Sequence, residues 1–286
     1  MESVVRAATA TLDEAGIVSS RSDAELLLAA HLHITRAEVL RQCLLGRALT
    51  GEQQTAYADL VRERATRVPL QHLTGSADFA GITLSVGPGV FVPRPETELI
   101  VQRATALAAG LGSPLIVDLC TGSGAIPLAL KHALPSAEIH AVELSNHAHA
   151  WAAHNVKMLA LDVDLGLGDA AQAFGDLLGE VDIVTCNPPY IPNGAVPVDP
   201  EVRDHDPAIA LYGDSGDGLR IPLQMAARAA DLLRPGGHLL MEHAESQSLT
   251  LVARLEGMAR WREIRHHRDL TGRPRMVEVV SGSTPL

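Results

Sequence analysis

The chain contains few aromatic residues, few cysteines and few lysines. Phenylalanine, tryptophan and tyrosine together make up 3% of its 286 residues, so leucine, valine, isoleucine and alanine must build the core. The three cysteines, Cys43, Cys120 and Cys186, form no C-x-x-C pair, which argues against a disulfide framework and indicates a reducing compartment. The sequence has neither zinc-ligand spacing nor an H-E-x-x-H pattern, and we therefore expect no metal site.

Long apolar runs, a leader pattern and a basic excess are absent as well. No stretch has the length that a bilayer-spanning helix needs, and the N-terminal segment carries acids and no continuous apolar core, unlike a signal peptide. The formal net charge is −11, whereas proteins that bind nucleic acid usually carry a basic excess. We therefore expect a soluble, cytoplasmic monomer with no membrane partner and no direct nucleic-acid partner.

Residues 1–72 have the pattern of a small helical bundle. Three residue pairs have the spacing of a capping box, in which two side chains at a helix start bond to each other's backbone. These pairs are Ser22 with Glu25, Thr35 with Glu38, and Thr50 with Gln53. Together with an amphipathic first stretch they predict four or five helices. Residues 73–92 contain short apolar runs punctuated by glycines, which predicts a β-hairpin linker.

Residues 93–286 have the pattern of one α/β domain. Predicted strands alternate with predicted helices, which is typical of a parallel sheet covered by helices on both faces. The predicted strands are 115–119, 139–144, 162–167, 181–186, 239–242, 261–266 and 276–280. The last two strands have little chain between them, so an antiparallel strand is expected at one edge of a mostly parallel sheet.

A glycine-containing loop follows the strand at 115–119. Its order, D-x-x-x-G-x-G over residues 118–124, is not the G-x-G-x-x-G of a dinucleotide site and suits a ligand that joins a nucleoside to an amino acid, such as S-adenosylmethionine. We expect Asp118 to meet the ammonium group of this ligand, directly or through water. Glu143 ends the next strand, where a carboxylate can accept the ribose hydroxyls. Asp169 follows a third strand, and either accepts from the adenine amino group or caps the next helix.

The most specific motif follows the strand at 181–186 and consists of Asn187, Pro188, Pro189 and Tyr190. The prolines fix the backbone and lack N–H donors, so backbone carbonyls stay free to accept hydrogen bonds. With the side-chain carbonyl of Asn187 they can hold a planar NH2 group by both hydrogens, while Tyr190 stacks on the flat group. Such acceptors orient a weakly nucleophilic nitrogen toward an activated methyl carbon. The motif therefore predicts methyl transfer to an amide or amino nitrogen.

Several motifs together resemble the release-factor glutamine methyltransferases, the HemK/PrmC family. The resemblance covers nearly the whole chain and is most specific at 89–98, with the sequence GVFVPRPETE, and at 187–190. Further matching stretches are PLQHLTG at 69–75, PEV at 200–202, GDGL at 216–219, LRPGG at 233–237 and DLTGRPR at 269–275. The resemblance implies a helical N-terminal domain, a hairpin linker and a class I S-adenosylmethionine-dependent methyltransferase domain with a Rossmann-like sheet.

The same resemblance implies the reaction and its residues. A methyl group would pass from S-adenosylmethionine to N5 of the glutamine in the Gly-Gly-Gln motif of class I peptide chain release factors, leaving S-adenosylhomocysteine. The expected catalytic and substrate-binding residues are Asn187, Pro188, Pro189 and Tyr190. The expected cofactor contacts are Asp118, Cys120, Thr121, Gly122, Ser123, Gly124, Glu143, Asp169, Ala170 and Asn187. The chain departs from the family at Cys120, where glycine is usual, at Glu143, where aspartate is frequent, and at Ala170, where a large side chain is frequent.

Other functions share parts of this pattern. An adenine or guanine amino methyltransferase acting on DNA or ribosomal RNA also binds a planar NH2 group, but the net charge and the lack of a basic target-recognition segment count against it. A non-catalytic S-adenosylmethionine-binding module would need neither Asn187 nor Tyr190, and both are present. For residues 1–72, docking of a protein substrate and simple stabilisation both remain open, and we favour docking.

Overall fold

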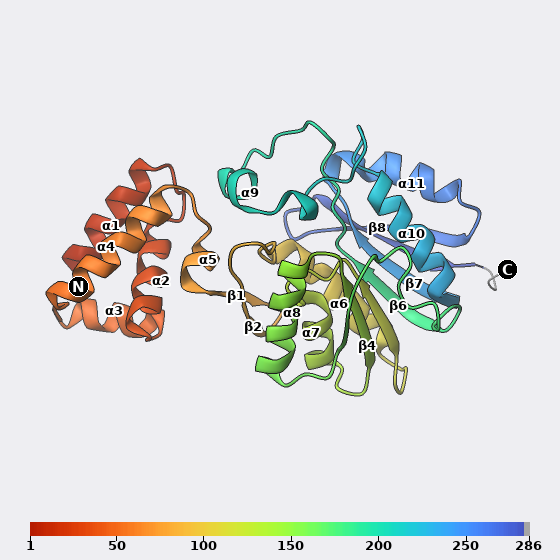
Figure 1. The fold of residues 1–286 in the computed structure, drawn as a ribbon, viewed down its shortest axis with the longest axis horizontal. Coiled ribbons are helices and arrows are strands. Elements are labelled where there is room, and N and C mark those ends of the chain that lie inside the picture. Colours follow the sequence, from red (N-terminus) through yellow and green to blue (C-terminus); the bar gives the residue numbers. More distant parts are fainter. Residues whose placement is uncertain (283–286) are drawn as a thin grey trace. The chain divides into compact units, whose positions relative to one another are not determined.

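The computed structural model describes residues 1–282, which fold into two compact units (Figure 1). The first unit contains Met1–Ser76, Val86–Pro88 and Pro197–His205, and the second contains Ala77–Ser85, Gly89–Val196 and the chain from Asp206 onward. The chain therefore returns to the first unit twice after leaving it. Among the described residues, no helix is long and apolar enough to cross a membrane. In the same part of the chain, no three His, Cys, Asp or Glu side chains are grouped so that they can hold a metal ion.

The first unit is a helical bundle, as the capping pairs and apolar spacing predict. Its helices are α1 (Glu2–Glu14), α2 (Ser20–Leu32), α3 (Arg36–Leu44), α4 (Gly51–Ala65) and the short α5 (Leu70–Thr74). They enclose a core that includes Val5, Leu12, Leu27, Val39 and Tyr57. The hydroxyl of Tyr57, the one aromatic side chain named in this core, donates to the backbone carbonyl of Ala24 at 2.8 Å, so its polar end is satisfied inside the bundle.

Two of the three predicted capping pairs start helices. The Thr35 hydroxyl accepts from the backbone N–H of Glu38 at the start of α3, and Thr50 forms a complete capping box with Gln53 at the start of α4. The helix start predicted at Ser22 is wrong, because Ser22 lies inside α2, whose N-cap is Ser19. The spacing there arises by chance within a helix that begins a few residues earlier.

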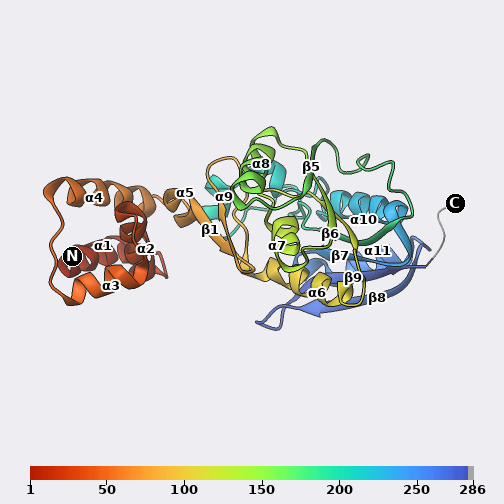
Figure 2. The same ribbon diagram turned by 90° about the horizontal axis from the view of Figure 1, so that it is seen from below.

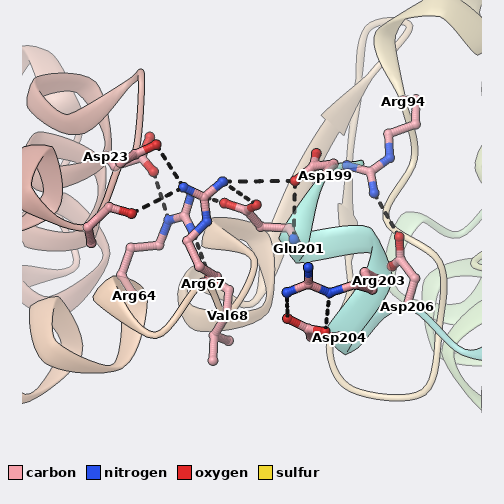
Figure 3. Close-up of polar contacts among 12 residues, drawn as sticks. Asp23, Arg64, Arg67, Val68, Arg94, Asp199, Glu201, Arg203, Asp204 and Asp206 are labelled. Carbon is pink, nitrogen blue, oxygen red and sulfur yellow. Dashed lines mark hydrogen bonds and ion pairs between the residues drawn. The ribbon is translucent and has the colours of Figure 1, made fainter. Parts of the chain in front are cut away.

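The segment Pro197–His205 belongs to the first unit through ion pairs with arginines at the end of α4 (Figure 3). Its short helix α9 (Pro200–His205) carries Glu201. One carboxylate oxygen of Glu201 lies 2.9 Å from Arg64 Nη2, and the other lies 2.6 Å from Arg67 Nη2. Burial opposes ionisation of this group, but hydrogen bonds from neighbouring side chains prevail and lower the pKa of Glu201 to about 2. An acid far along the chain thus becomes part of the helical unit.

Arg64 connects this acid to the interior of the bundle. Its Nε donates to Asp23 of α2 at 2.8 Å, and its Nη1 donates to the backbone carbonyl of Val68 at 3.0 Å. The Arg64 and Asp23 side chains are only 6% and 5% exposed. A buried guanidinium needs carboxylate partners to offset its loss of hydration, and Arg64 has one from its own helical bundle and one from α9.

The second unit is built on a sheet of seven strands within the described residues, in the order β5-β4-β3-β6-β7-β9-β8. Figure 2 labels β5, β6, β7, β9 and β8 of this sheet. The strands from β5 to β7 are parallel, and β9 is antiparallel to both β7 and β8. Their bounds are β3 (Leu115–Leu119), β4 (Glu138–Glu143), β5 (Asp164–Leu167), β6 (Val181–Cys186), β7 (Leu233–Glu242), β8 (Trp261–Arg268) and β9 (Pro274–Ser281). This order confirms the predicted mostly parallel sheet with antiparallel pairing at one edge.

Both faces of the sheet are buried. Successive side chains of a strand point to opposite faces, and in β3 both Val117 and its neighbours Ile116 and Asp118 have no exposed surface. Val117 packs in one cluster with Met225 and Leu251 from the helices that follow β6 and β7. The helices of this unit are α6 (Glu98–Ala108), α7 (Ala125–Ala133), α8 (Asn146–Leu159), α10 (Arg220–Leu232) and α11 (Ser248–Glu256). Continuous apolar runs in the central strands follow from this double burial.

Two further segments complete the second unit. The predicted hairpin is present as β1 (Ser76–Phe79) and β2 (Ile82–Ser85). The sequence Pro235-Gly236-Gly237 is part of β7, which begins directly where α10 ends. The register of β7 against β6 shifts between Val181 and Ile183. The extra residues of this irregularity accommodate the Pro-Gly-Gly sequence inside a strand.

Candidate active site

The glycine loop lies at the carboxyl end of β3 and leads into α7. Beneath it, Asp118 has no exposed surface, and its two oxygens accept from the Thr121 hydroxyl at 2.5 Å and the Thr185 hydroxyl at 2.6 Å. Burial raises the pKa of Asp118 to about 7. Its contacts tie the loop to the neighbouring strand β6. These contacts support the loop, and contact of Asp118 with a ligand's ammonium group, directly or through water, stays a prediction.

Glu143, at the end of β4, faces the same loop. Its Oε2 accepts from the backbone N–H of Gly122 at 2.8 Å, and its Oε1 accepts from that of Ser145 at 2.7 Å. Burial raises the pKa of Glu143, and the backbone donors oppose this rise. Because each carboxylate oxygen has a second lone pair, Glu143 keeps the capacity to accept two further hydroxyls. A Cβ added at Gly122, where φ is +58°, would meet no atom within 4 Å, so open space adjoins the loop there.

Asp169 and Ala170 follow β5 at the next strand end. The backbone N–H of Gly168 donates to the Glu143 carbonyl at 2.9 Å, which joins this strand end to that of β4. Asp169 is exposed, and its Oδ1 accepts from the backbone N–H of Ala171 at 2.9 Å, so it caps a turn rather than a helix. Ala170 is buried. The contact of Asp169 with an adenine amino group stays a prediction.

The Asn-Pro-Pro-Tyr motif follows β6 at the same edge of the sheet. Its backbone is held through the carbonyl of Tyr190, which accepts from Gln247 Nε2 at 2.7 Å. Gly218 approaches the same carbonyl so closely that an added Cβ would lie 2.1 Å from the oxygen. Gln247 also donates to the Asp217 carbonyl at 2.8 Å. The loop that contains 217–218 and the side chain of Gln247 therefore fix the end of the motif.

Two buried residues that the motif analysis did not single out connect Asn187 with Tyr190. Asn187 Nδ2 lies 3.3 Å from Thr97 Oγ1, whose hydroxyl donates to Glu242 Oε2 at 2.6 Å. The Tyr190 hydroxyl donates to Glu242 Oε1 at 3.1 Å. Burial raises the pKa of Glu242 to about 7, although the two hydroxyl donors lower it. Thr97 could be found from its place in the family-like stretch at 89–98, whereas for Glu242 the only signal was an acid at the end of a strand.

Asn155 is a further residue that the sequence patterns do not reveal. This side chain of α8 has no exposed surface. Its Oδ1 accepts from the backbone N–H of Ser85 at 2.8 Å, and its Nδ2 donates to the carbonyls of Ser85 at 2.9 Å and Ser123 at 3.0 Å. One amide thus holds the hairpin strand β2 against the glycine loop.

Comparison with known proteins identifies the family. Residues 3–75 match the family model of the PrmC N-terminal domain, and residues 82–199 match that of the methyltransferase small domain. A release factor glutamine methyltransferase of Streptomyces coelicolor is 45% identical to the chain over 275 residues, which are 95% of this chain and 94% of that protein. The chain belongs to the release factor glutamine methyltransferase family. The resemblance drawn from the sequence motifs is thereby confirmed.

Another curated relative and a solved structure are also similar to the chain. A protein of Streptomyces pristinaespiralis named 4-amino-L-phenylalanine/4-methylamino-L-phenylalanine methyltransferase is 38% identical over 260 residues, which are 89% of this chain and 86% of that protein. Among solved structures, the hMettl16 catalytic domain in complex with the MAT2A 3′UTR hairpin 6 has a TM-score of 0.55 at 17% identity and covers 78% of this chain and 82% of that one. At this identity the likeness concerns the fold alone, which is that of class I S-adenosylmethionine-dependent methyltransferases.

The site of this family member fits S-adenosylmethionine. A nucleoside needs an acceptor for its ribose hydroxyls, and Glu143 has free lone pairs beside the open space over Gly122. The glycine allows close approach of a ligand to the loop backbone. Enzymes of this fold class use S-adenosylmethionine as the methyl donor, which agrees with the predicted cofactor.

The backbone conformation at Cys120 shows why glycine suits this position. Cys120 has φ +63°, in the left-handed region, where a residue with a Cβ is disfavoured by about 1–2 kcal/mol. Glycine, which is usual in the family at this position, adopts such a conformation without that strain. The Cys120 side chain is partly buried, and its Sγ lies 3.6 Å from Met225 Sδ. The loop therefore keeps the glycine-type conformation although a cysteine occupies the position.

Proposed function

We propose that the protein methylates N5 of the glutamine in the Gly-Gly-Gln motif of class I peptide chain release factors, with S-adenosylmethionine as donor and S-adenosylhomocysteine as product. The observation that carries this proposal is the Asn-Pro-Pro-Tyr motif at the carboxyl end of β6, in a chain that is 45% identical over nearly its full length to a release factor glutamine methyltransferase. The partly buried contacts of Asn187 and Tyr190 support the motif as a fixed site for a planar NH2 group.

The chain's own residues position the glutamine. The Asn187 side-chain oxygen and the carbonyl after it accept the two N–H groups of the substrate amide, and Pro188 and Pro189 contribute no competing donor. Tyr190 lies along the flat amide. Bound S-adenosylmethionine supplies a methyl group activated by the adjacent sulfonium. Two acceptors on the amide raise the electron density on its nitrogen and fix its direction, so placement and electrostatics provide most of the rate. The surplus proton leaves the nitrogen to solvent.

The cofactor residues divide into contacts and supports. Glu143 accepts the ribose hydroxyls, and the backbone from Cys120 to Gly124 lines the methionine portion. Asp118 acts by holding Thr121 and thereby the loop. Asp169 and Ala170 border the adenine, and Asn187 borders the methyl-donating end. These assignments follow the predicted residues, and contact of Asp118 with the ligand's ammonium group, directly or through water, stays a prediction.

We further propose that the helical region 1–72 docks the release factor and that 73–92 links it to the methyltransferase domain, 93–286. Deleting residues 1–70 should raise KM for a whole release factor far more than for a short Gly-Gly-Gln peptide. The deletion also removes Arg64 and Arg67 from Glu201, so full-length Glu201→Gln is the matched control for loss of that anchor. An equal rise in KM for both substrates would contradict docking.

The same proposal implies a cytoplasmic monomer that binds release factors and neither membrane nor nucleic acid directly. Release factors act on ribosomes in the cytoplasm, and the net charge of −11 disfavours binding to nucleic acid. Size-exclusion chromatography with light scattering measures the oligomeric state, and a mass of twice the chain would contradict the monomer.

A second candidate is methylation of an aromatic amine. The relative named 4-amino-L-phenylalanine/4-methylamino-L-phenylalanine methyltransferase favours it at 38% identity, and an arylamine also presents an NH2 group on a flat support. This candidate comes second because the release factor glutamine methyltransferase of Streptomyces coelicolor is 45% identical to the chain, against 38% for the amine methyltransferase.

One experiment separates these functions. Purified protein and labelled S-adenosylmethionine are incubated with a class I release factor, with the same factor carrying alanine in place of the Gly-Gly-Gln glutamine, with 4-amino-L-phenylalanine, and with DNA or ribosomal RNA. We expect label on the first factor alone. Label on 4-amino-L-phenylalanine and not on the factor would establish the second candidate, and label on nucleic acid would establish an amino methyltransferase of nucleic acids.

A further inference from the structure

The hydroxyl of Thr97 lies between the catalytic motif and a buried carboxylate. Thr97 and Glu242 are 4% and 3% exposed. The chain of contacts runs from Asn187 Nδ2 to Thr97 Oγ1 at 3.3 Å and from Thr97 Oγ1 to Glu242 Oε2 at 2.6 Å. The other oxygen of Glu242 accepts from the Tyr190 hydroxyl at 3.1 Å. Both polar ends of the motif therefore reach one carboxyl group.

The Thr97 side chain takes no part in capping a helix. Thr97 directly precedes α6 with helical backbone angles (φ −68°, ψ −19°), and its side chain makes no capping bond. In the first unit, by contrast, Thr35 and Thr50 have extended backbones and accept backbone N–H groups at the starts of their helices. The Thr97 hydroxyl points instead to Glu242 and Asn187, which indicates a role in the site.

The turn that contains Thr97 is itself held in place. Thr97 ends the short helix η1 (Pro95–Thr97), and its backbone N–H donates to the Arg94 carbonyl at 3.1 Å. The Arg94 guanidinium lies over the Phe91 ring, 4.9 Å from its centroid, and pairs with the buried Asp206 carboxylate at 2.8 Å (Figure 3). The family-like stretch at 89–98 thus fixes the backbone that presents the Thr97 hydroxyl.

The proton positions in this chain follow from the number of donors. In the structure the Thr97 hydroxyl donates its single proton to Glu242 Oε2 at 2.6 Å, which is the direction required when Glu242 is ionised, because a carboxylate only accepts. Thr97 Oγ1 then has no proton left for Asn187, and its lone pairs can only accept an N–H from it. Asn187 must therefore turn its NH2 group toward Thr97 and its carbonyl oxygen away from it. The direction of one hydroxyl proton decides which end of the Asn187 amide is available.

We propose that Thr97 and Glu242 are positioning residues, which hold the Asn187 amide with its oxygen toward the substrate nitrogen. This inference rests on the proposed function, because an acceptor is needed only if the substrate presents an NH2 group. With the amide turned by 180°, the NH2 group of Asn187 would face the NH2 group of the substrate, and both donors would lose a partner. An unsatisfied buried polar group costs about 1–3 kcal/mol, which corresponds to roughly a 5- to 150-fold loss in rate.

Three variants test the assignment. Thr97→Val keeps the shape of the side chain and removes the hydroxyl, while Thr97→Ser keeps the hydroxyl. We expect Thr97→Val to lower kcat for the release factor by about tenfold or more and to leave the Kd for S-adenosylmethionine within about twofold. Thr97→Ser should retain a kcat within about threefold of the parent protein. Circular dichroism and thermal melting confirm that each variant is folded.

A double-mutant cycle with Asn187→Ala separates positioning from general support of the fold. If Thr97 acts by orienting the Asn187 amide, Thr97→Val should change single-turnover methylation by less than about twofold once Asn187 is alanine. Equal losses in the two backgrounds would overturn the inference, as would a Thr97→Val protein with the parent kcat.

An observation that does not depend on turnover keeps the two proposals distinguishable. In the ¹⁵N NMR spectrum of the parent protein, the side-chain NH2 protons of Asn187 should show a nuclear Overhauser contact with the Thr97 methyl group. If the parent protein does not methylate a release factor, the proposed function is refuted. Absence of this contact in a protein that does methylate release factors would refute the orientation of Asn187.

Discussion

Replacing Gly218 with alanine should damage both stability and catalysis, because this glycine packs against the catalytic motif. A Cβ at Gly218 would lie 2.1 Å from the Tyr190 carbonyl oxygen and 2.8 Å from Gln247 Nε2. A carbon and an oxygen approach no closer than about 3.3 Å without strain, so the motif or the loop must move by about 1 Å. Gly218 also has φ +72°, in the region that disfavours a side chain.

The expected cost follows from these two effects. The left-handed conformation contributes about 1–2 kcal/mol for a residue with a Cβ, and forced repacking around the added methyl group contributes about 1–3 kcal/mol. We therefore expect Gly218→Ala to lower the free energy of unfolding by about 2–5 kcal/mol. Because the displaced carbonyl belongs to Tyr190, kcat should fall as well, under conditions in which the variant remains folded.

A matched control lies two residues away. A Cβ at Gly216 would meet no atom within 4 Å, and this glycine is not among those with positive φ. Gly216→Ala should therefore change the free energy of unfolding by less than about 0.5 kcal/mol and leave kcat intact. Urea unfolding and methylation kinetics on both variants measure the difference. Equal unfolding midpoints for Gly216→Ala and Gly218→Ala would refute the packing argument, and a destabilised but fully active Gly218→Ala would refute the link to catalysis.

Three other substitutions, one of them with a control variant, give further expected outcomes. Burial raises the pKa of Glu242 from 4.5 to about 7, so its contribution to stability is lost as pH rises through that window. The free energy of unfolding of Glu242→Gln should therefore rise by up to about 3 kcal/mol relative to that of the parent protein between pH 5 and pH 8. A difference in urea unfolding that does not change with pH would contradict this. Arg64→Met leaves the buried Asp23 without an arginine partner and Glu201 with Arg67 alone, and it should cost about 3–5 kcal/mol. Arg62→Ala removes a side chain that is 72% exposed and should cost less than about 1 kcal/mol. Urea unfolding measures both, and similar costs would disprove the role of burial. Asn187→Ala should lower kcat on the order of a hundredfold with a smaller change in cofactor Kd, and calorimetry that finds cofactor binding abolished would make Asn187 chiefly a cofactor ligand.

The sequence predicted the strand ends at which the motifs of the proposed site lie. The glycine loop and the Asn-Pro-Pro-Tyr motif each follow a strand and Glu143 ends one, and parallel strands bring their carboxyl ends to one edge of the sheet. Alternation of strands and helices was enough to predict this arrangement, because apolar periodicity is a local signal. Capping pairs and glycine-punctuated apolar runs, which are local signals too, predicted the helical unit and the hairpin.

The residues that the sequence did not reveal act across long separations. Thr97 and Glu242 are 145 residues apart, and Asn155 reaches a strand 70 residues earlier in the chain. No local pattern marks such pairs, since their burial and partners are decided by packing of distant elements. Asp118 shows the same limit in another way. Its motif position predicted contact with the ligand, directly or through water, but no local pattern indicated that the hydroxyls of Thr121 and Thr185 donate to it.

The ion pairs of Glu201 have a consequence for the order in which the protein is completed during synthesis. Arg67 and Glu201 are separated by 134 residues, which a ribosome adds in on the order of ten seconds. Throughout that interval the arginines at the end of α4 lack their later acid, and Arg64 has Asp23 as its carboxylate partner. Because residues 187–190 precede Glu201, the catalytic motif is synthesised before the helical unit can close its charge pairs. The helical unit begins the sequence, yet the nascent chain completes it late.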